Sequence, residues 1–153
     1  MYQKIIRLLT AIALIILTGC ASVPMANADK NVELKKFNAP PENKAGLYIF
    51  RNTFLGKALK KTVTLDGAII GETANKVYFY RAVEPGKHTI STESEFSDNI
   101  TTFEAISGKN YFAEQFIKMG AFVGGASIRM IDDEVGKKNV LECNLAEENP
   151  NVK

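Results

Sequence analysis

The alternation of apolar and polar residues along positions 45–146 predicts an all-β domain. Short runs rich in Tyr, Phe, Ile, Val and Thr are separated by turn residues throughout this stretch, and such runs are typical of strands. The stretch is long enough for one hydrophobic core. We therefore expect a small antiparallel β-sandwich of about seven strands, with room for a short helix near its C-terminal end.

The first predicted hairpin joins residues 62–65 to residues 68–71. Thr alternates with apolar residues in the first run, as it does in a half-buried strand. Asp66 and Gly67 stand between the two runs, and they suit the positive φ angles that a two-residue hairpin turn demands. The preceding run, 47–51, is expected to be the first strand of the domain.

A second hairpin is expected around a proline-glycine turn. Residues 76–83 carry apolar side chains on both faces, which is typical of a central strand. Pro85 and Gly86 follow, and this pair favours a type II turn. Residues 88–92 are then expected to return as an antiparallel partner of 76–83.

The rest of the domain continues the same pattern. Residues 100–106 and 111–118 flank a Ser-Gly-Lys-Asn turn and are expected to pair, and residues 127–131 form the last predicted strand. The acidic residues 132–134 suit the positive end of a helix dipole and predict a short helix. The apolar side of this helix would consist of Val135, Val140 and Leu141.

The first twenty residues have the pattern of a lipoprotein signal. Lys4 and Arg7 precede an apolar run that ends in Leu17-Thr18-Gly19-Cys20. A positive start, a short apolar segment and small residues before a cut site are typical of a secretory signal. The cysteine after the cut site resembles the bacterial lipoprotein type, in which the thiol is diacylated, with palmitate for example. We expect cleavage between Gly19 and Cys20, and lipidation of Cys20.

Other interpretations of this segment fit less well. Twelve residues separate Arg7 from Cys20, whereas a membrane-spanning helix needs roughly 20 apolar residues. A buried helix that is apolar on all sides would need a protein shell around it. An uncleaved signal anchor and an ordinary secretory signal remain as alternatives.

The charge balance argues against a nucleic-acid partner. The chain has 19 Lys and Arg against 17 Asp and Glu, and loss of Lys4 and Arg7 with the signal leaves 17 of each. A near-neutral domain lacks the basic surface that phosphate backbones select. Lys57, Lys60 and Lys61 form a small cluster, which we interpret as a solvated strand end.

The cysteines and the histidine do not form a recognisable catalytic or metal site. If Cys20 carries lipid, Cys143 has no disulfide partner among the two cysteines of the chain, and we expect it to be buried as a small hydrophobic residue. His88 starts a strand after a turn and is expected to pack against that turn. A single histidine is no metal signature.

Two further motifs are interpreted structurally. The glycine-rich stretch from Gly120 to Gly125 lacks the Lys-Ser or Lys-Thr of a P-loop and is expected to be a loop or bulge. Asp132 and Asp133 are expected to start the helix and not to bind a cation. We therefore expect no catalytic, cofactor-binding or metal-binding residues.

Residues 20–44 are polar, contain three prolines and show no apolar periodicity, so they are expected to form the lipidated cysteine and a flexible tether. A flexible chain of this length has a reach of roughly 25 to 30 Å, which would hold the domain clear of the membrane. Whether a short piece around Val32, Leu34 and Phe37 docks on the domain is left open. Residues 147–153 are expected to be a polar tail.

Four motifs occur in a characteristic order within the domain. They are Ala45-Gly46-Leu47-Tyr48-Ile49-Phe50-Arg51, Val63-x-Leu65-Asp66-Gly67 with Ile70-Gly71, Tyr78-Phe79, and Val83-x-Pro85-Gly86-x-His88. This order is similar to that of a bacterial lipoprotein family known as domain of unknown function 2846. The last motif also resembles surface-layer β modules named after a Pro-Glu-Gly-Ala motif.

The resemblance covers about residues 45–146. It implies a small β-sandwich presented in the cell envelope, with no established activity and no catalytic residues to carry over. Ala21 and Ser22 follow the cysteine in place of the aspartate associated with inner-membrane retention. The resemblance therefore implies placement at the outer membrane.

Together these features predict a lipid-anchored bacterial envelope protein whose domain faces the periplasm. The expected partners are the membrane, through the lipid, and an envelope protein or glycan, bound by a non-catalytic module. The alternative is an envelope hydrolase or thiol enzyme that uses Cys143 or His88 with a carboxylate such as Glu84. That alternative requires these groups to meet in one cleft.

Overall fold

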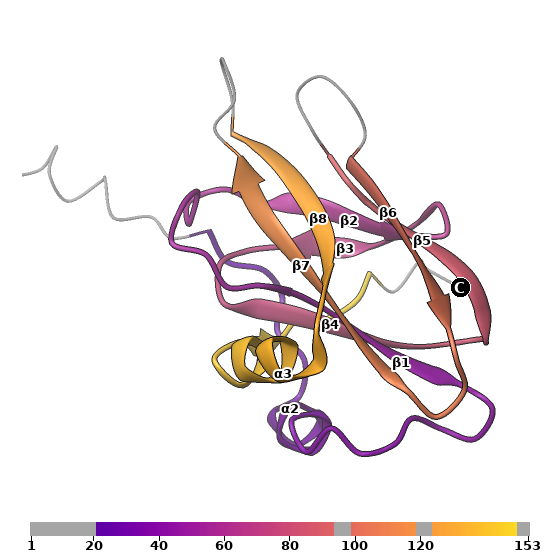
Figure 1. Ribbon diagram of the computed structural model, residues 1–153. Coiled ribbons are helices and arrows are strands. Elements are labelled where there is room, and N and C mark those ends of the chain that lie inside the picture. The colour runs from indigo at the N-terminus through magenta and orange to yellow at the C-terminus, as the bar shows by residue number, and fades with distance from the viewer. Residues whose placement is uncertain (1–20, 94–98, 119–123, 150–153) are drawn as a thin grey trace, which may run out of the picture.

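The computed structural model describes residues 21–93, 99–118 and 124–149, and in this part of the chain two β-sheets pack face to face (Figure 1). In chain order the elements are α2 (Ala28–Leu34), β1 (Ala45–Arg51), β2 (Lys61–Leu65), β3 (Ala68–Thr73), β4 (Val77–Val83), β5 (Gly86–Thr92), β6 (Asn99–Ala105), β7 (Asn110–Lys118), β8 (Gly125–Ile131), α3 (Asp133–Leu141) and β9 (Asn144–Leu145). The expected all-β sandwich with a short C-terminal helix is confirmed, with nine strands in the described residues.

The larger sheet has the order β8-β7-β1-β4-β9, and the smaller sheet has the order β3-β2-β5-β6. The smaller sheet is antiparallel. The larger sheet departs from the antiparallel expectation, because β1 pairs in parallel with β7 and β4 pairs in parallel with β9. Parallel neighbours need a long crossover connection, and the passage of the chain through the smaller sheet supplies it between β1 and β7.

The hairpin between β2 and β3 is confirmed. The φ angles are +50° at Asp66 and +82° at Gly67, and Leu65 lies opposite Ala68. Positive φ at both central residues is the geometry that matches the right-handed twist of the two strands.

The two other expected hairpins are wrong, although the chain reverses its direction at both places. Gly86 and Gly108 have φ angles of +129° and +81°, but β4 and β5 enter different sheets, and so do β6 and β7. β4 enters the larger sheet, and does not pair with β5, because both of its faces are apolar. It lies between β1 and β9, where Phe79 joins the core between the sheets and Tyr78 joins a second core on the outer face.

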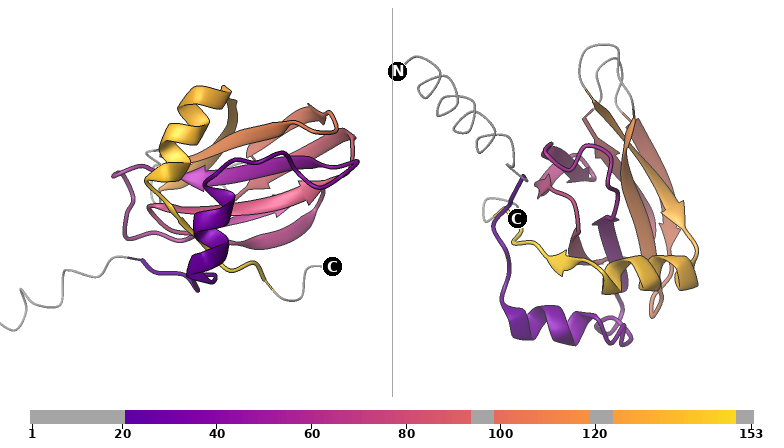
Figure 2. Two further views of the ribbon diagram at one scale, coloured as in Figure 1. Left: turned by 90° about the horizontal axis from the view of Figure 1, so that it is seen from below. Right: turned by 90° about the vertical axis from the view of Figure 1, so that its left-hand side faces the viewer.

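The second core lies between the larger sheet and the two helices, which sit on the same side of the sandwich (Figure 2). Tyr48, Phe50, Tyr78 and Phe112 are buried there together with Val140 of α3. The larger sheet is thus covered on both faces, which explains why β1 is buried along its whole length. No helix in the described ranges is long and apolar enough to cross a membrane.

Helix α3 starts where the sequence predicts, but of the three residues expected on its apolar side only Val140 is buried, whereas Val135 and Leu141 are exposed. The Asp132 carboxylate caps the helix by accepting a hydrogen bond of 3.1 Å from the Val135 amide. Val135 is exposed, and the buried positions are Gly136 and Val140. A Cβ atom at Gly136 would lie 2.3 Å from Cγ of Phe112, so a glycine lets the helix approach the sheet closely.

The described part of the expected tether lies against the domain. Val23 is buried in the core between the sheets, and the Ala26 amide donates to the Leu145 carbonyl at 3.0 Å. Helix α2 follows, and its Leu34 carbonyl accepts a hydrogen bond of 2.9 Å from the Tyr48 hydroxyl. Phe37 also joins the second core. The segment packs here because the aromatic residues on the outer face of the larger sheet would otherwise be exposed to water.

The described part of the expected polar tail is also packed. The Glu147 amide donates to the Pro24 carbonyl at 2.9 Å, and the Asn149 amide donates to the Ile70 carbonyl at 2.8 Å. These bonds tie the segment to residues 21–26 and to β3. Residues 150–153 lie outside the described ranges.

The sandwich has two ends that differ in character. At the end that we call the turn end lie the turns at 66–67, 84–86 and 106–109. At the opposite end, the loop end, β1 and β7 terminate and the 52–60 loop lies beside Ala21, whose amide donates to the Lys57 carbonyl at 3.3 Å.

Candidate functional site

A cleft of about 350 Å³ opens at the turn end, between the first hairpin of the smaller sheet and the end of β4. Its lining residues are Leu65, Asp66, Ala68, Ile70, Arg81, Ala82, Val83, Glu84 and His88. The cleft brings together two of the residues singled out from the sequence, His88 and Glu84. It is therefore the candidate site whose chemistry the structure defines in most detail.

Both ring nitrogens of His88 are engaged. Nδ1 lies 2.6 Å from a carboxylate oxygen of Asp66, and Nε2 lies 2.7 Å from the backbone carbonyl oxygen of Glu84. A carbonyl and a carboxylate both accept hydrogen bonds, so both nitrogens donate, which is the hydrogen-bonding state of the imidazolium cation. His88 thus joins the turn at 66–67 to the turn at 84–86.

The surroundings of His88 favour the charged ring. Burial lowers the pKa of His88, but the hydrogen bonds to Asp66 and to the Glu84 carbonyl, with the negative charges of Asp66 and Glu104, outweigh it, so the pKa is raised above its usual value. The ring also packs against Phe103, with centroids 5.6 Å apart. His88 is a turn-packing residue, as expected, and neither nitrogen is left to act as a base.

The charged side chains of the cleft are paired. Arg81 forms an ion pair of 2.9 Å with Glu148, which lies outside the cleft lining. Asp66 pairs with His88, and Glu84 pairs with Lys44. Burial raises the pKa of Glu148 above its usual value, although the positive charges of Arg81 and Lys30 oppose this shift. The cleft therefore offers charged groups of both signs around an apolar floor formed by residues such as Ile70 and Val83.

Cys143 lies in the second core, between the larger sheet and the helices, and does not contact His88. It is fully buried among the residues of the second core, and its thiol contacts the Arg51 carbonyl oxygen at 3.7 Å. Burial raises the pKa of the thiol to about 12. The larger sheet separates this core from the core between the sheets, so Cys143 and His88 share no cleft, and the expected burial of Cys143 is confirmed.

The other candidate motifs have local roles. Asp132 caps α3, and Asp133 pairs with Lys137 at 3.5 Å. No group of three or more His, Cys, Asp or Glu side chains that could hold a metal ion occurs within the described residues. Of the glycine-rich stretch, Gly124 and Gly125 are described, and Gly125 begins β8, whereas residues 119–123 lie outside the described ranges.

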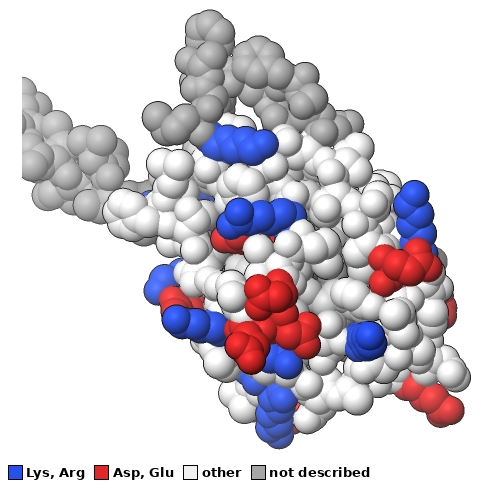
Figure 3. Space-filling model, viewed as in Figure 1, with Lys and Arg blue, Asp and Glu red and all other residues white. Residues whose placement is uncertain are grey.

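The small basic cluster is divided among different partners. Lys60 pairs with Glu72 at 3.6 Å and Lys61 pairs with Glu93 at 3.9 Å, while the Lys57 ammonium lies 4.7 Å from the Phe54 ring centroid. On the face shown in Figure 3, Lys and Arg alternate with Asp and Glu. This mixture agrees with the small excess of 19 Lys and Arg over 17 Asp and Glu in the chain.

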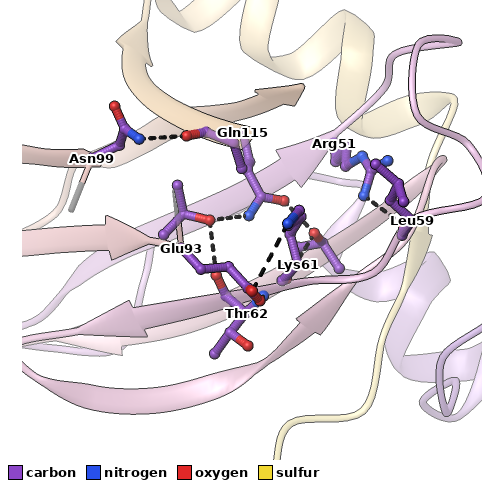
Figure 4. Close-up of polar contacts among 10 residues, drawn as sticks. Arg51, Leu59, Lys61, Thr62, Glu93, Asn99 and Gln115 are labelled. Carbon is purple, nitrogen blue, oxygen red and sulfur yellow. Dashed lines mark hydrogen bonds and ion pairs between the residues drawn. The ribbon is translucent and has the colours of Figure 1, made fainter. Parts of the chain in front are cut away.

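The residue that sequence reasoning missed is Arg51. It is fully buried at the end of β1. Its guanidinium donates to the Leu59 carbonyl oxygen at 2.9 Å (Figure 4) and also to the Gly56 carbonyl oxygen. Burial lowers its pKa. In the described residues no carboxylate pairs with it. A charged residue directly after the apolar run 47–50 was the signal that could have revealed it.

A buried polar network lies at the same end of the sandwich. The Gln115 amide donates to the Thr92 hydroxyl, which in turn donates to the Thr62 carbonyl at 2.8 Å, and the Thr73 hydroxyl donates to the Gln115 amide oxygen (Figure 4). Gln115 comes from the larger sheet, and its partners come from the smaller one. The network holds the two sheets together behind the 52–60 loop.

The expected lipidation and cleavage site, Gly19 and Cys20, lies outside the described residues. The next residue, Ala21, is described and sits beside the 52–60 loop at the loop end. Ala21 and the cleft with His88 therefore lie at opposite ends of the sandwich.

Comparisons with known proteins place the chain in a family. It is 46% identical to an uncharacterized protein of Haemophilus influenzae (strain ATCC 51907 / DSM 11121 / KW20 / Rd) over 132 residues, which cover 86% of this chain and 79% of that protein. No solved structure matches it. A family model described as "Protein of unknown function (DUF2846)" matches residues 41–126. The chain belongs to this family.

Proposed function

We propose that the protein is a lipoprotein of the bacterial cell envelope, anchored through acylated Cys20, whose β-sandwich is a non-catalytic interaction module. The observation that carries the anchor is the sequence Leu17-Thr18-Gly19-Cys20 at the end of a short apolar run. The structure supports it because Ala21 is half-buried at the edge of the core and Ser22 is exposed. An acyl chain on Cys20 would reach a membrane without disturbing Val23 in the core.

The geometry of the candidate groups supports a binding role over catalysis. His88 donates from both nitrogens, and Cys143 is buried with a raised pKa. A general base needs a free acceptor, and a thiol nucleophile needs a thiolate. The cleft at the turn end instead offers charges of both signs, which suits an envelope protein or a glycan as partner. The outer membrane, with the domain in the periplasm, is the proposed location.

The anchor is tested by metabolic labelling with a fatty acid. In the Cys20→Ala variant we expect labelling to disappear and the domain to move from the membrane fraction to the soluble envelope fraction. The matched control is Cys143→Ala, which removes the other cysteine and should label like the natural protein. Labelling that persists in Cys20→Ala would overturn the lipid anchor.

The interaction module is tested by site-specific crosslinking in intact envelopes. A photo-crosslinking residue at Ala68, an exposed position that lines the cleft, should give one reproducible adduct, and the same residue at Lys138 on α3 should not. The adduct should weaken when Arg81→Gln removes the pair with Glu148. Equal, heterogeneous adducts from both positions would contradict a binding role for the cleft.

A further inference from the structure

The loop end of the sandwich presents an apolar tip. Phe54 is 79% exposed and Leu55 is 46% exposed, and the Lys57 ammonium lies over the Phe54 ring at 4.7 Å. Large exposed apolar side chains cost free energy in water, and a lysine beside them is a composition typical of surfaces that lie in a membrane interface. The tip formed by these three residues is thus suited to a bilayer surface.

The tip is held in place from within the domain. The buried guanidinium of Arg51 donates to the Gly56 and Leu59 carbonyls, and the Leu59 amide donates to the Gly56 carbonyl at 2.8 Å. At the other side of the loop the Thr53 amide donates to the Asn75 side chain at 3.1 Å. A loop that is already ordered loses little conformational entropy when it binds a surface.

The tip also lies next to the point where the chain leaves the described domain. The Ala21 amide donates a hydrogen bond of 3.3 Å to the Lys57 carbonyl. The residue that follows the expected lipidation site therefore lies beside the tip. The reach of roughly 25 to 30 Å expected of a flexible tether does not apply, since the segment that would supply it packs on the domain from Ala21 onward.

We propose that the tip docks on the phospholipid bilayer that holds the acyl chains of Cys20, with Phe54 and Leu55 in the interface and Lys57 at the lipid phosphates. This inference rests on the proposed lipid anchor. Two or more acyl chains anchor a protein stably by themselves, so the tip sets the orientation of the domain and contributes little to its retention. The domain then stands directly on the membrane with the cleft at its far end.

The test compares two exposed aliphatic positions at opposite ends of the sandwich. Leu55 is 46% exposed at the loop end, and Ile106 is 51% exposed at the turn end. A polarity-sensitive fluorophore is attached to the Leu55→Cys or the Ile106→Cys variant of the acylated full chain. Buried Cys143 does not compete for the label. Each variant is bound to vesicles of phosphatidylethanolamine and phosphatidylglycerol that contain brominated lipid.

We expect several-fold stronger quenching by brominated lipid at position 55 than at position 106, together with a blue shift at position 55. Quenching should be independent of protein density on the vesicle. Equal, weak quenching in protein that sediments with the vesicles would overturn the docking and leave the anchor intact. If the fluorophore at position 55 is shielded from water increasingly as the protein density on the vesicle rises, copies of the chain contact each other there. That result would overturn the docking. Protein that carries no acyl chain and fails to sediment would overturn both proposals.

Discussion

Arg51 and Leu59 are joined across the base of the 52–60 loop by a hydrogen bond of 2.9 Å from the guanidinium Nη1 to the carbonyl oxygen. This bond ties a fully buried charge to the loop that carries the exposed Phe54 and Leu55. A buried charge is costly unless its donors are satisfied. Here the Leu59 and Gly56 carbonyls accept from the two terminal nitrogens, whereas Nε has no hydrogen-bond partner among the described residues. The relationship links the core of the sandwich to the surface proposed to face the membrane.

Removal of the Arg51 guanidinium should loosen this loop. In the Arg51→Met variant the Gly56 and Leu59 carbonyls lose their donor, so we expect the free energy of unfolding to fall by about 1–3 kcal/mol. Hydrogen exchange of the Leu59 amide should also become faster. The control is Arg129→Met on the exposed face of β8, which should change stability by less than about 0.5 kcal/mol. Unchanged exchange at Leu59 in Arg51→Met would contradict the role assigned to Arg51.

The pair of His88 and Asp66 should make stability depend on pH. The pKa of His88 is raised in the folded protein above its ordinary value of 6.5, so the pair stabilises the fold fully below about pH 6.5. That contribution is lost as the pH rises through the folded pKa. Urea unfolding of the natural protein should therefore show stability falling from pH 6 towards alkaline pH.

The Asp66→Asn variant removes the negative charge beside His88 but keeps the turn at 66–67. Asn-Gly supports the same positive φ angles as Asp-Gly, so the hairpin of β2 and β3 should be retained while the negative charge beside His88 is lost. We expect the fall in stability above about pH 6.5 to become smaller in this variant. A pH profile parallel to that of the natural protein would show that Asp66 does not raise the pKa of His88.

Gly136 should be intolerant of even a methyl group. Alanine favours helices over glycine by about 1 kcal/mol, but a Cβ at Gly136 would lie 2.3 Å from Phe112. We expect Gly136→Ala to lower the free energy of unfolding by about 1–3 kcal/mol, as overpacking does. Lys138→Ala, on the exposed face of the same helix, should be nearly neutral. A stabilised Gly136→Ala protein would mean that α3 does not press on Phe112.

Cys143 should be inert in the folded protein. Burial raises its pKa to about 12 and leaves no exposed surface on the residue. At pH 8 a maleimide should modify Cys143 only at the rate of unfolding, and urea should accelerate the reaction sharply. The matched comparison is Leu55→Cys, whose exposed thiol should react at once. Rapid modification of native Cys143 would reopen the thiol-enzyme alternative.

Local turn chemistry made part of the fold predictable. Asp66-Gly67 determines its own backbone angles, so the hairpin around it could be inferred from a few adjacent residues. The turns at Gly86 and Gly108 were also predictable, but not the sheets that their arms join. Those partners depend on which faces become buried across the whole molecule, and a short sequence window does not contain that information.

For the candidate sites too, features set by neighbouring residues were predictable and features set by distant residues were not. The burial of Cys143 and the packing role of His88 followed from their neighbours, whereas Asp66 as the partner of His88 lies 22 positions away. Residues 21–44 looked like a tether because their composition is polar. A few apolar residues, Val23 and Phe37 among them, are enough to dock the segment, because Tyr48 and Phe112 present an apolar face that needs a cover. Arg51 was missed because its acceptors are carbonyls of an irregular loop.

Acylation of Cys20 can be measured by the mass of the N-terminal peptide of the protein purified from bacterial envelopes. We expect a peptide that begins at Cys20 and carries acyl chains. A peptide in which Gly19 and Cys20 remain joined, or one with an unmodified Cys20, would contradict the proposed lipid anchor.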